Sequence, residues 1–487
     1  MNPLFRRKSL DALMADAEAP ERHLRRALGP IELIALGIGA VIGAGIFATV
    51  GTAAAGGAHH VGAGPAIVIS FLITAIGCGL CALCYAEFAS LVPVSGSAYT
   101  YSYATLGEFV AWIIGWDLII EYAMGNVAVA VSWSGYFCEL MKGFGLDIPA
   151  WLRTDLKTAL HSPEILQSAP HLGSIPIVFN LPAVLITALI TWVLVIGIKE
   201  SSRFNTGLVL LKVVIILFFI VVGAFYVKPE NWTPFAPNGW QGIGVGAALI
   251  FFAYIGFDAV STAAEECRNP QKDMPIGMMG TLAICTLIYI AVALVLTGIV
   301  PLDAIKGSAE PLAKAFSILG MNWAAGIVAF GAVIATAAVL LVFQLGQARI
   351  FFSMARDGLL PRGFAAVHPR YLTPHKTTIW IGVAVALLAA FANLDVFVEL
   401  TNIGTLFAFI LVCAAVIILR RREPNRPRPF RTPFVPWVPL FGIAVCLYLM
   451  MNLPAATWIR FGIWLLIGVV IYFAYGFKRS RLANPGR

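Results

Sequence analysis

The chain has 487 residues, of which 60% are hydrophobic and only 12% are charged, and its formal net charge is +8. Soluble domains are about 45 to 50% apolar and about 25% charged, so this composition excludes an ordinary soluble protein and predicts a polytopic membrane protein. The positive charge is no sign of a nucleic-acid partner, because Lys and Arg concentrate in the N-terminal segment, in alternate loops and in the tail.

Long apolar runs predict the spanning helices. A bilayer core of about 30 Å requires about 20 mostly apolar residues in each helix. The chain has twelve such runs, at residues 31–55, 66–92, 108–136, 178–197, 207–227, 241–263, 278–299, 323–346, 377–393, 397–419, 434–453 and 458–477. The distribution of basic residues predicts cytoplasmic N- and C-termini. We therefore expect an all-α, multi-pass protein of the cell (inner or plasma) membrane, surrounded by membrane lipids.

The first run contains the stretch GAVIGAGIFATVG, which places Gly43 and Gly45 near the middle of a spanning helix. Glycine weakens a helix by about 1 kcal/mol relative to alanine. The pattern has two interpretations: close helix packing, since Gly39 and Gly43 have the required spacing, or a break in the helix. A break at this depth needs a surrounding cavity, and it leaves carbonyls that attract a cation and amides that attract an anion. A zwitterionic amino acid carries both charges.

The second run contains CGLCALC, which spaces Cys78, Cys81 and Cys84 like part of an iron–sulfur binding run. Such a site needs a fourth thiolate and a loop that wraps the cluster, whereas these cysteines lie on one apolar helix. We expect small packing residues, with no metal. The other five cysteines are scattered along the chain and predict no disulfide framework.

A few charged residues lie inside the predicted spans, where each costs at least about 2.5 to 3.5 kcal/mol and so indicates a function. Asp117 and Glu121 lie four residues apart in the third run, and Lys212 lies in the fifth. A lysine away from bulk water can cycle between charged and neutral forms, or it can be a permanent cation held between carbonyls of the first helix. Glu87 and Glu399 fall near helix ends, where an interfacial role is expected.

The sixth run contains FFAYIGFDAVSTAAEE, in which Gly256 is followed by Asp258. Breaks at corresponding positions of two halves indicate a transporter site. The expected organisation is a cytoplasmic segment at 1–30, a first repeat of helices 1–5 at 31–227, a second repeat of helices 6–10 at 241–419, helices 11 and 12 at 434–477, and a cytoplasmic tail at 478–487.

Signatures of enzymes are absent from the sequence. LGIGAVIG resembles the start of a dinucleotide-binding fingerprint, but no strand precedes it and no acidic residue follows about 20 positions on. The chain has no Walker motif, zinc-protease signature or nucleophile elbow. We expect a protein that is not an enzyme and that uses no cofactor.

Several longer motifs together resemble the amino acid-polyamine-organocation superfamily: GIGAVIGAGIF, YAEFASLVPVSGSAYTYSY, FFAYIGFDAVSTAAEECRNPQKDMPIG and GQARIFFSMARDGLLP. Within it, IGTLFAFILVCAAVIILR, PFRTPFVPWVPLFGI and the N-terminal stretch from FRRK onward are similar to the cationic amino acid transporter family, in its twelve-helix bacterial form. The resemblance implies a LeuT-like five-plus-five inverted repeat with discontinuous helices 1 and 6, and alternating access.

The same resemblance implies a binding site. The substrate carboxylate would meet amides around Ala44 and Gly45, although many relatives have Ser or Thr at position 44. The ammonium would meet carbonyls of Val41, Ile42, Phe252, Ala253 and Ile255. Lys212 matches the helix 5 lysine that replaces sodium in proton-coupled members, and Glu121, Asp258 and Tyr289 match a polar network around it.

Helix 8 is expected to line the side-chain pocket with Val339, Leu340 and Phe343, which include no acid. Burying a guanidinium there without a partner would be costly. We therefore expect a symporter that imports neutral L-amino acids with protons. Cationic substrates stay open, because Glu121 or Asp258 could pair with them, and so does obligate exchange of two amino acids. The sequence does not reveal whether a small membrane subunit is a partner.

Overall fold

The computed structural model describes residues 4, 6–8, 28–57, 60–91, 97–160, 162–172, 175–197, 202–262, 267–371 and 373–483. Seven helices of these ranges are long and apolar enough to cross a membrane. They are α4 (Ile67–Leu91), α6 (Glu108–Gly143), α10 (Ser202–Ala224), α13 (Pro270–Ile299), α15 (Asn322–Arg356), α17 (Leu394–Arg422) and α19 (Ala455–Ile471), which continues through a π turn into α20 (Phe477–Arg479).

The remaining apolar segments are shorter or bent. The pair α2 (Pro30–Val41) and Gly45–Ala55 forms an eighth candidate span with a bend of 48°. Four shorter apolar helices are α9 (Leu181–Ile196), α11 (Gly239–Ile250, extended by a 3-10 turn at Phe251–Tyr254), α16 (His375–Phe391) and α18 (Trp437–Met451). Every predicted apolar run therefore corresponds to a helix or to a broken helix. The exposed side chains of these helices include many large apolar ones, such as Leu72, Trp192 and Leu287, as a lipid-facing surface requires.

Local sequence explains where several helices begin. Pro30, Pro182, Pro270 and Pro311 lie in the first turn of α2, α9, α13 and α14 (Pro311–Ile318), where a missing amide hydrogen costs nothing. Pro270 also explains a difference from the prediction, because α13 begins there rather than at 278 and contains Pro275. The polar end of α15 likewise continues the helix to Arg356, ten residues beyond the predicted run.

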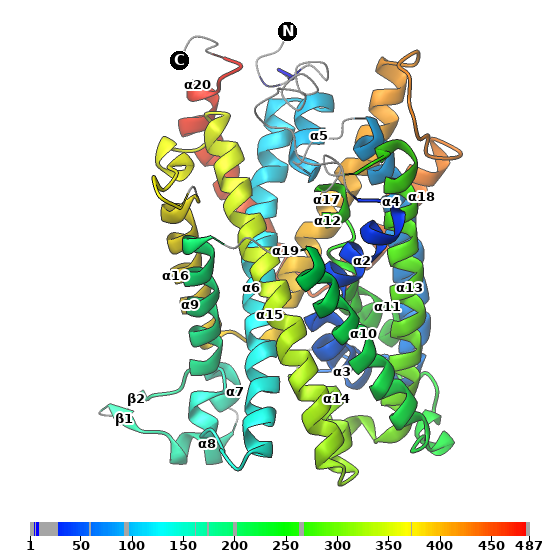
Figure 1. Cartoon of the computed structure of the whole chain (residues 1–487), viewed down its shortest axis with the longest axis vertical. Helices are drawn as coiled ribbons and strands as arrows, with labels where there is room; N and C mark the ends of the chain where they lie inside the picture. Colours follow the sequence, from blue (N-terminus) through cyan, green and yellow to red (C-terminus); the bar gives the residue numbers. More distant parts are fainter. Residues whose placement is uncertain are drawn as a thin grey trace.

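Short elements lie at the two ends of the long helices (Figure 1). One end carries α7 (Leu156–Leu160), α8 (Pro163–Ser168) and a hairpin of β1 (His171–Leu172) and β2 (Ile175–Pro176), in which His171 pairs with Pro176. The other end carries α5 (Ser97–Thr105) and α20. The apolar runs do not predict α5 and α14, because each has fewer than ten residues.

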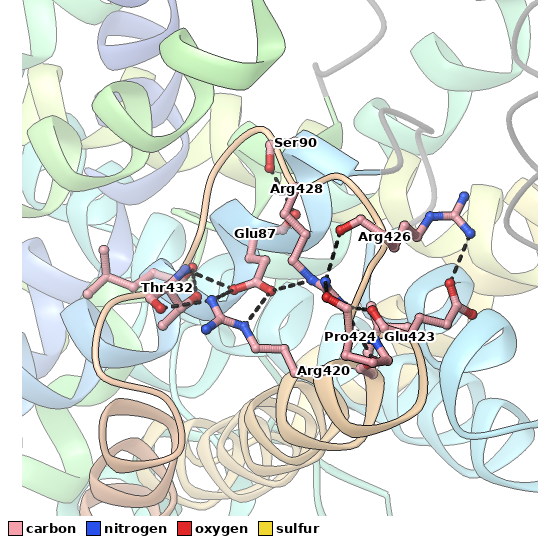
Figure 2. Close-up of polar contacts among 10 residues, drawn as sticks. Glu87, Ser90, Arg420, Glu423, Pro424, Arg426, Arg428 and Thr432 are labelled. Atoms are coloured by element: carbon pink, nitrogen blue, oxygen red, sulfur yellow. Dashed lines mark hydrogen bonds and ion pairs between the residues drawn. The ribbon is translucent and has the colours of Figure 1, made fainter.

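The end of the molecule near α5 is held together by a buried ionic network (Figure 2). Glu87, in the last turn of α4, accepts hydrogen bonds from Arg420 Nε at 3.0 Å, from Arg420 Nη2 at 2.7 Å and from the Thr432 amide at 2.8 Å. Arg428 Nε lies 3.3 Å from the same carboxylate. The loop after α17 is thereby attached to α4, so Glu87 is a structural anchor rather than a surface residue.

Candidate functional site

The first helix is interrupted where Gly43 and Gly45 predict a break. α2 ends at Val41, Ile42 has extended backbone with φ −75° and ψ 101°, and a π turn begins at Gly45 before α3 (Val50–Ala55). Close packing is also present, since a Cβ on Gly43 would lie 2.6 Å from Val339 Cγ2. Both interpretations of the glycines therefore hold: they permit the break and the approach of a neighbouring helix.

The sixth span is interrupted in the same manner. α11 ends at Ile250, a 3-10 turn follows, Ile255 is extended, and helical structure resumes in α12 (Ala259–Thr262). Gly256 has φ +115°, and a Cβ there would lie 2.9 Å from the carbonyl oxygen of Ala40. Only glycine suits both the dihedral angle and the close approach.

The two breaks lie against each other. A Cβ on Gly45 would be 2.2 Å from Ala253 Cα, so the two backbones are in direct contact. The buried Tyr289 hydroxyl lies 3.1 Å from the Val41 carbonyl oxygen and 2.9 Å from that of Ala253. Tyr289 on α13 therefore bridges the first break to the second and can donate to either carbonyl.

Lys212 of α10 reaches the same place from another side. Its ammonium donates to the Gly39 carbonyl at 2.9 Å and to the Ile42 carbonyl at 3.4 Å, and the side chain is 2% exposed. No salt bridge to Lys212 is found within the described ranges. The predicted carbonyl ligands Val41, Ile42 and Ala253 are thus bound by Tyr289 or Lys212 here, and each carbonyl oxygen has a second lone pair for a further donor.

The helix 8 side of the site is apolar. Val339 packs against Gly43, and the Phe343 ring would lie 2.7 Å from a Cβ on Gly125 of α6. Leu340 is buried and follows Val339 by one position, about 100° around α15. The sequence of α15 contains no acidic residue. Val339 therefore offers an aliphatic surface to the first break.

Comparison with known proteins places the chain in a family. Residues 28–474 match the family described as amino acid permease. The chain belongs to the amino acid permease family. The permease is 48% identical to the branched-chain amino acid permease BcaP of Bacillus subtilis (strain 168), over 98% of this chain and 99% of that protein.

Two other relatives widen the range of substrates named within the family. The methylthioribose transporter of the same organism is 47% identical, over 99% of this chain and all of that protein. Cationic amino acid transporter 4, vacuolar, of Arabidopsis thaliana is 33% identical, over 99% of this chain and 97% of that protein. These relatives are membrane transporters and not enzymes, as the sequence predicts for this permease.

Three acids of the permease lie inside the helical bundle. Glu121 of α6 is 4% exposed, and Asp258, just after the second break, is 6% exposed. The two acids lie close enough for their negative charges to interact. Asp117, one turn before Glu121, is fully buried and is absent from the predicted site.

Sequence reasoning also missed Asn402 of α17. Its side-chain amide donates to the carbonyls of Ala248 at 2.7 Å and Leu249 at 3.1 Å, which are among the last carbonyls of α11. Ala248 and Leu249 lie in the last turn of α11, so Asn402 attaches α17 to the end of the helix at the second break. The signal was a lone amide side chain in an otherwise apolar span.

Within the described ranges, no group of three or more His, Cys, Asp or Glu side chains is arranged to hold a metal ion. All eight cysteines lie within the described ranges, where they form no disulfide and are buried. They are less scattered than the sequence suggests, because Cys81 Sγ lies 3.6 Å from Cys446 Sγ and 3.7 Å from Cys413 Sγ. Three helices, α4, α17 and α18, meet at this cluster, which packs the helices together.

Proposed function

We propose that the permease is a proton-coupled symporter that imports neutral L-amino acids by alternating access. The observation that carries the proposal is the contact of the Lys212 ammonium with carbonyls of Gly39 and Ile42 at the first helix break. A buried cation at the point where a substrate ammonium is expected links the charge of the protein to substrate binding.

The coupling follows from the protonation state of Lys212, because it decides whether α10 is held to the carbonyls of the first break. While Lys212 carries its proton, its ammonium occupies the carbonyls of the break and holds α10 against α2. When Lys212 gives up that proton, it no longer offers a charged donor, and the carbonyls are released from α10. Proton movement therefore changes how α10 contacts the broken helix, and that change is what couples the proton to transport.

The proposed binding mode uses backbone groups of both breaks. The substrate carboxylate binds the amides of Ala44 and Gly45, which begin the second half of the first span, where helix N-termini attract anions. The ammonium binds carbonyls of Phe252 and Ile255, together with the free lone pairs on Val41, Ile42 and Ala253. Glu121, Asp258 and Tyr289 form the network that exchanges protons with Lys212.

The proposed architecture has twelve spans, because the four shorter apolar helices cross the membrane as well as the eight longer candidates. Helices 1–5 at 31–227 and helices 6–10 at 241–419 form the inverted repeat, with one break at the start of each. Helices 11 and 12 at 434–477 lie outside it. Segments 1–30 and 478–487 are cytoplasmic, and the protein lies in the cell membrane among its lipids.

The proposed substrates have small or branched apolar side chains. Val339, Leu340 and Phe343 form an apolar wall on α15, and a guanidinium placed against it would lose its water without gaining a carboxylate. The similarity to a branched-chain amino acid permease supports this choice. Cationic amino acids are the second choice, through pairing with Glu121 or Asp258, and the similarity to a cationic amino acid transporter supports that alternative.

The test is uptake of L-leucine into proteoliposomes that contain the purified permease. We expect accumulation under an inward proton gradient, indifference to sodium, and loss of accumulation with a protonophore. Lys212→Ala is expected to abolish accumulation, whereas Lys228→Ala in an exposed loop serves as the matched control and keeps it. A sodium requirement, or unchanged accumulation in Lys212→Ala, contradicts the coupling.

The second candidate is obligate exchange of two amino acids, which the same paired breaks would support. Proteoliposomes preloaded with unlabelled leucine distinguish the two functions. Counterflow of labelled leucine without net uptake under any gradient favours exchange. Net uptake into empty vesicles favours the symporter and shows that the permease needs neither an internal substrate nor a further membrane subunit.

A further inference from the structure

Asp117 of α6 has an unusual environment. Its side chain is fully buried, and neither of its carboxyl oxygens has a hydrogen-bond partner among the residues that the structure describes. Glu121, one helical turn away, also has a buried oxygen, Oε2, for which the described part of the chain provides no hydrogen-bond partner. A carboxylate that is buried without a donor or a counter-charge is among the most costly groups in a protein interior, so its presence at membrane depth indicates a function.

Both acids face the same point on α17. A Cβ on Gly404 would lie 2.9 Å from Asp117 Oδ1 and 3.7 Å from Glu121 Cβ. The missing side chain of Gly404 thus leaves the space into which the Asp117 carboxyl points. Because residues four apart on a helix are neighbours, the two acids form a pair between α6 and α17.

The charged and titratable neighbours of this pair come from three other elements. The negative charge of Asp258, beyond the second break, interacts with that of Glu121. Tyr85 of α4 lies close enough to interact with the charges of both Asp258 and Glu121. The positive charge of Arg349 on α15 interacts with Tyr122, the residue that follows Glu121. From α17, the nearest residues, Gly404 and Thr405, are uncharged, so like charges dominate the surroundings of the pair.

Asp117 lies closer than Glu121 to the proposed cytoplasmic end of α6. α6 runs from Glu108, at the end of the molecule that holds α5, to Gly143 at the opposite end. Glu108 accepts hydrogen bonds from Tyr472 near α20, so this end is the one with the proposed cytoplasmic tail. At 1.5 Å per residue, Asp117 lies about 6 Å closer to that end than Glu121 does. A proton that reaches Glu121 from the breaks therefore meets Asp117 next on the way inward.

We propose that Asp117 is the proton carrier on the cytoplasmic side of the site. Asp117 and Glu121 share a single proton, because two carboxylates in one buried site do not both ionise readily. Glu121 gives its carboxyl proton to the Asp117 carboxylate, and the negative charge moves to Glu121. As Asp117 releases this proton to cytoplasmic water, Glu121 takes up a new proton from the side of Asp258, so the pair keeps one proton throughout. This inference rests on the proposed symport.

The test compares proton-driven accumulation with proton-independent exchange in Asp117→Asn, which keeps the shape of the side chain but cannot carry the proton. L-Leucine accumulation under an inward proton gradient is expected to fall more than about tenfold. Counterflow in preloaded vesicles without a gradient is expected to stay within about twofold, and its dependence on pH is expected to flatten. Asp117→Glu is expected to restore part of the accumulation.

The controls separate a structural role from a coupling role. Asp147→Asn, in an exposed loop, is expected to leave both assays unchanged. Gly404→Ala crowds the Asp117 carboxyl without changing any charge, and it is expected to lower accumulation several-fold more than counterflow. If Asp117→Asn does not fold, the Gly404→Ala result decides the question.

The outcomes also separate this inference from the proposed function. Wild-type vesicles that do not accumulate leucine under a proton gradient refute the symporter and the relay with it. Wild-type accumulation that persists unchanged in Asp117→Asn refutes only the role of Asp117. An equal fall in accumulation and counterflow assigns Asp117 to scaffolding and overturns the inference.

Discussion

Gly45 and Ala253 bring the two helix breaks into backbone contact, because a Cβ on Gly45 would lie only 2.2 Å from Ala253 Cα. Gly45→Ala is therefore expected to push the breaks apart, with loss of substrate binding and a fall in stability of about 1 to 3 kcal/mol. The bulkier Gly45→Leu is expected to be worse. Thermal unfolding with and without L-leucine measures both effects, since a bound ligand raises the melting temperature.

Gly326 provides the control for this substitution. It lies on α15, and apart from the backbone of its own helix no atom of the described residues lies within 4 Å of the position of an added Cβ. Gly326→Ala is expected to leave leucine binding intact and to stabilise the helix by up to about 1 kcal/mol. Equal behaviour of the two variants would show that contact between the breaks is not required.

Tyr289→Phe removes the hydroxyl that bridges the breaks. The carbonyls of Val41 and Ala253 then lose a buried donor, which is expected to cost about 1 to 3 kcal/mol of stability and to slow transport. Chemical denaturation and leucine uptake measure the two effects. Tyr226→Phe, which changes a half-exposed tyrosine, is the control and is expected to alter stability and uptake very little. Wild-type stability and uptake in Tyr289→Phe would show that the bridge is dispensable.

Glu87→Ala tests the ionic network between α4 and the loop after α17 (Figure 2). The substitution leaves Arg420 and the buried Arg428 without their shared carboxylate, which is expected to destabilise the protein by about 3 to 5 kcal/mol. Glu423→Ala removes a more exposed carboxylate that pairs with Arg426, and it is expected to cost about 0 to 1 kcal/mol. A similar fall in melting temperature for both variants would contradict the anchoring role of Glu87.

His60 lies in the loop after α3, outside the spanning helices, and we expect it to make the stability of the protein depend on pH. Burial works against a charge on its ring, but the carboxylate of Asp395, 3.7 Å away, outweighs burial and raises the pKa of His60. Because the pKa of His60 is higher in the folded protein, the His60–Asp395 pair contributes its full stabilisation at pH values below the pKa of the unfolded chain, about 6.5. This contribution is lost as the pH rises through the pKa of the folded protein.

The measurement compares the melting temperature of the wild type with that of His60→Gln from pH 5 to pH 9. The wild type is expected to be more stable than the variant at acid pH, and the difference is expected to vanish at alkaline pH. Asp395→Asn removes the partner and is expected to show the same pattern. A difference that is independent of pH would show that His60 acts through packing and not through its charge.

The sequence predicts local features of this fold well. Gly43, Gly45 and Gly256 locate the two breaks because glycine changes the backbone at its own position. Apolar runs locate the helices for a similar reason, since the bilayer selects length and composition. The helix starts at Pro30 and Pro270 are explained by the chemistry of proline, although the apolar run placed the start of α13 at residue 278.

Contacts between distant segments lie beyond such reasoning. Lys212 meets Gly39 across 173 positions of the chain, and the sequence shows only that a lysine lies in an apolar run. The meeting of Cys81 with Cys413 and Cys446, and of Asp117 with Gly404, depends on how helices rotate about their axes. Small residues permit several such packings, so composition does not select one.

The burial of all eight cysteines has a practical consequence for following the transport cycle. A maleimide dye that does not enter the protein interior finds no native thiol at the surface. A single cysteine introduced at an exposed position, such as Lys228→Cys, then becomes the only labelled site in an otherwise unmodified chain. Two such positions at opposite ends of the helices would report the distance between dyes during turnover, without the removal of any native cysteine.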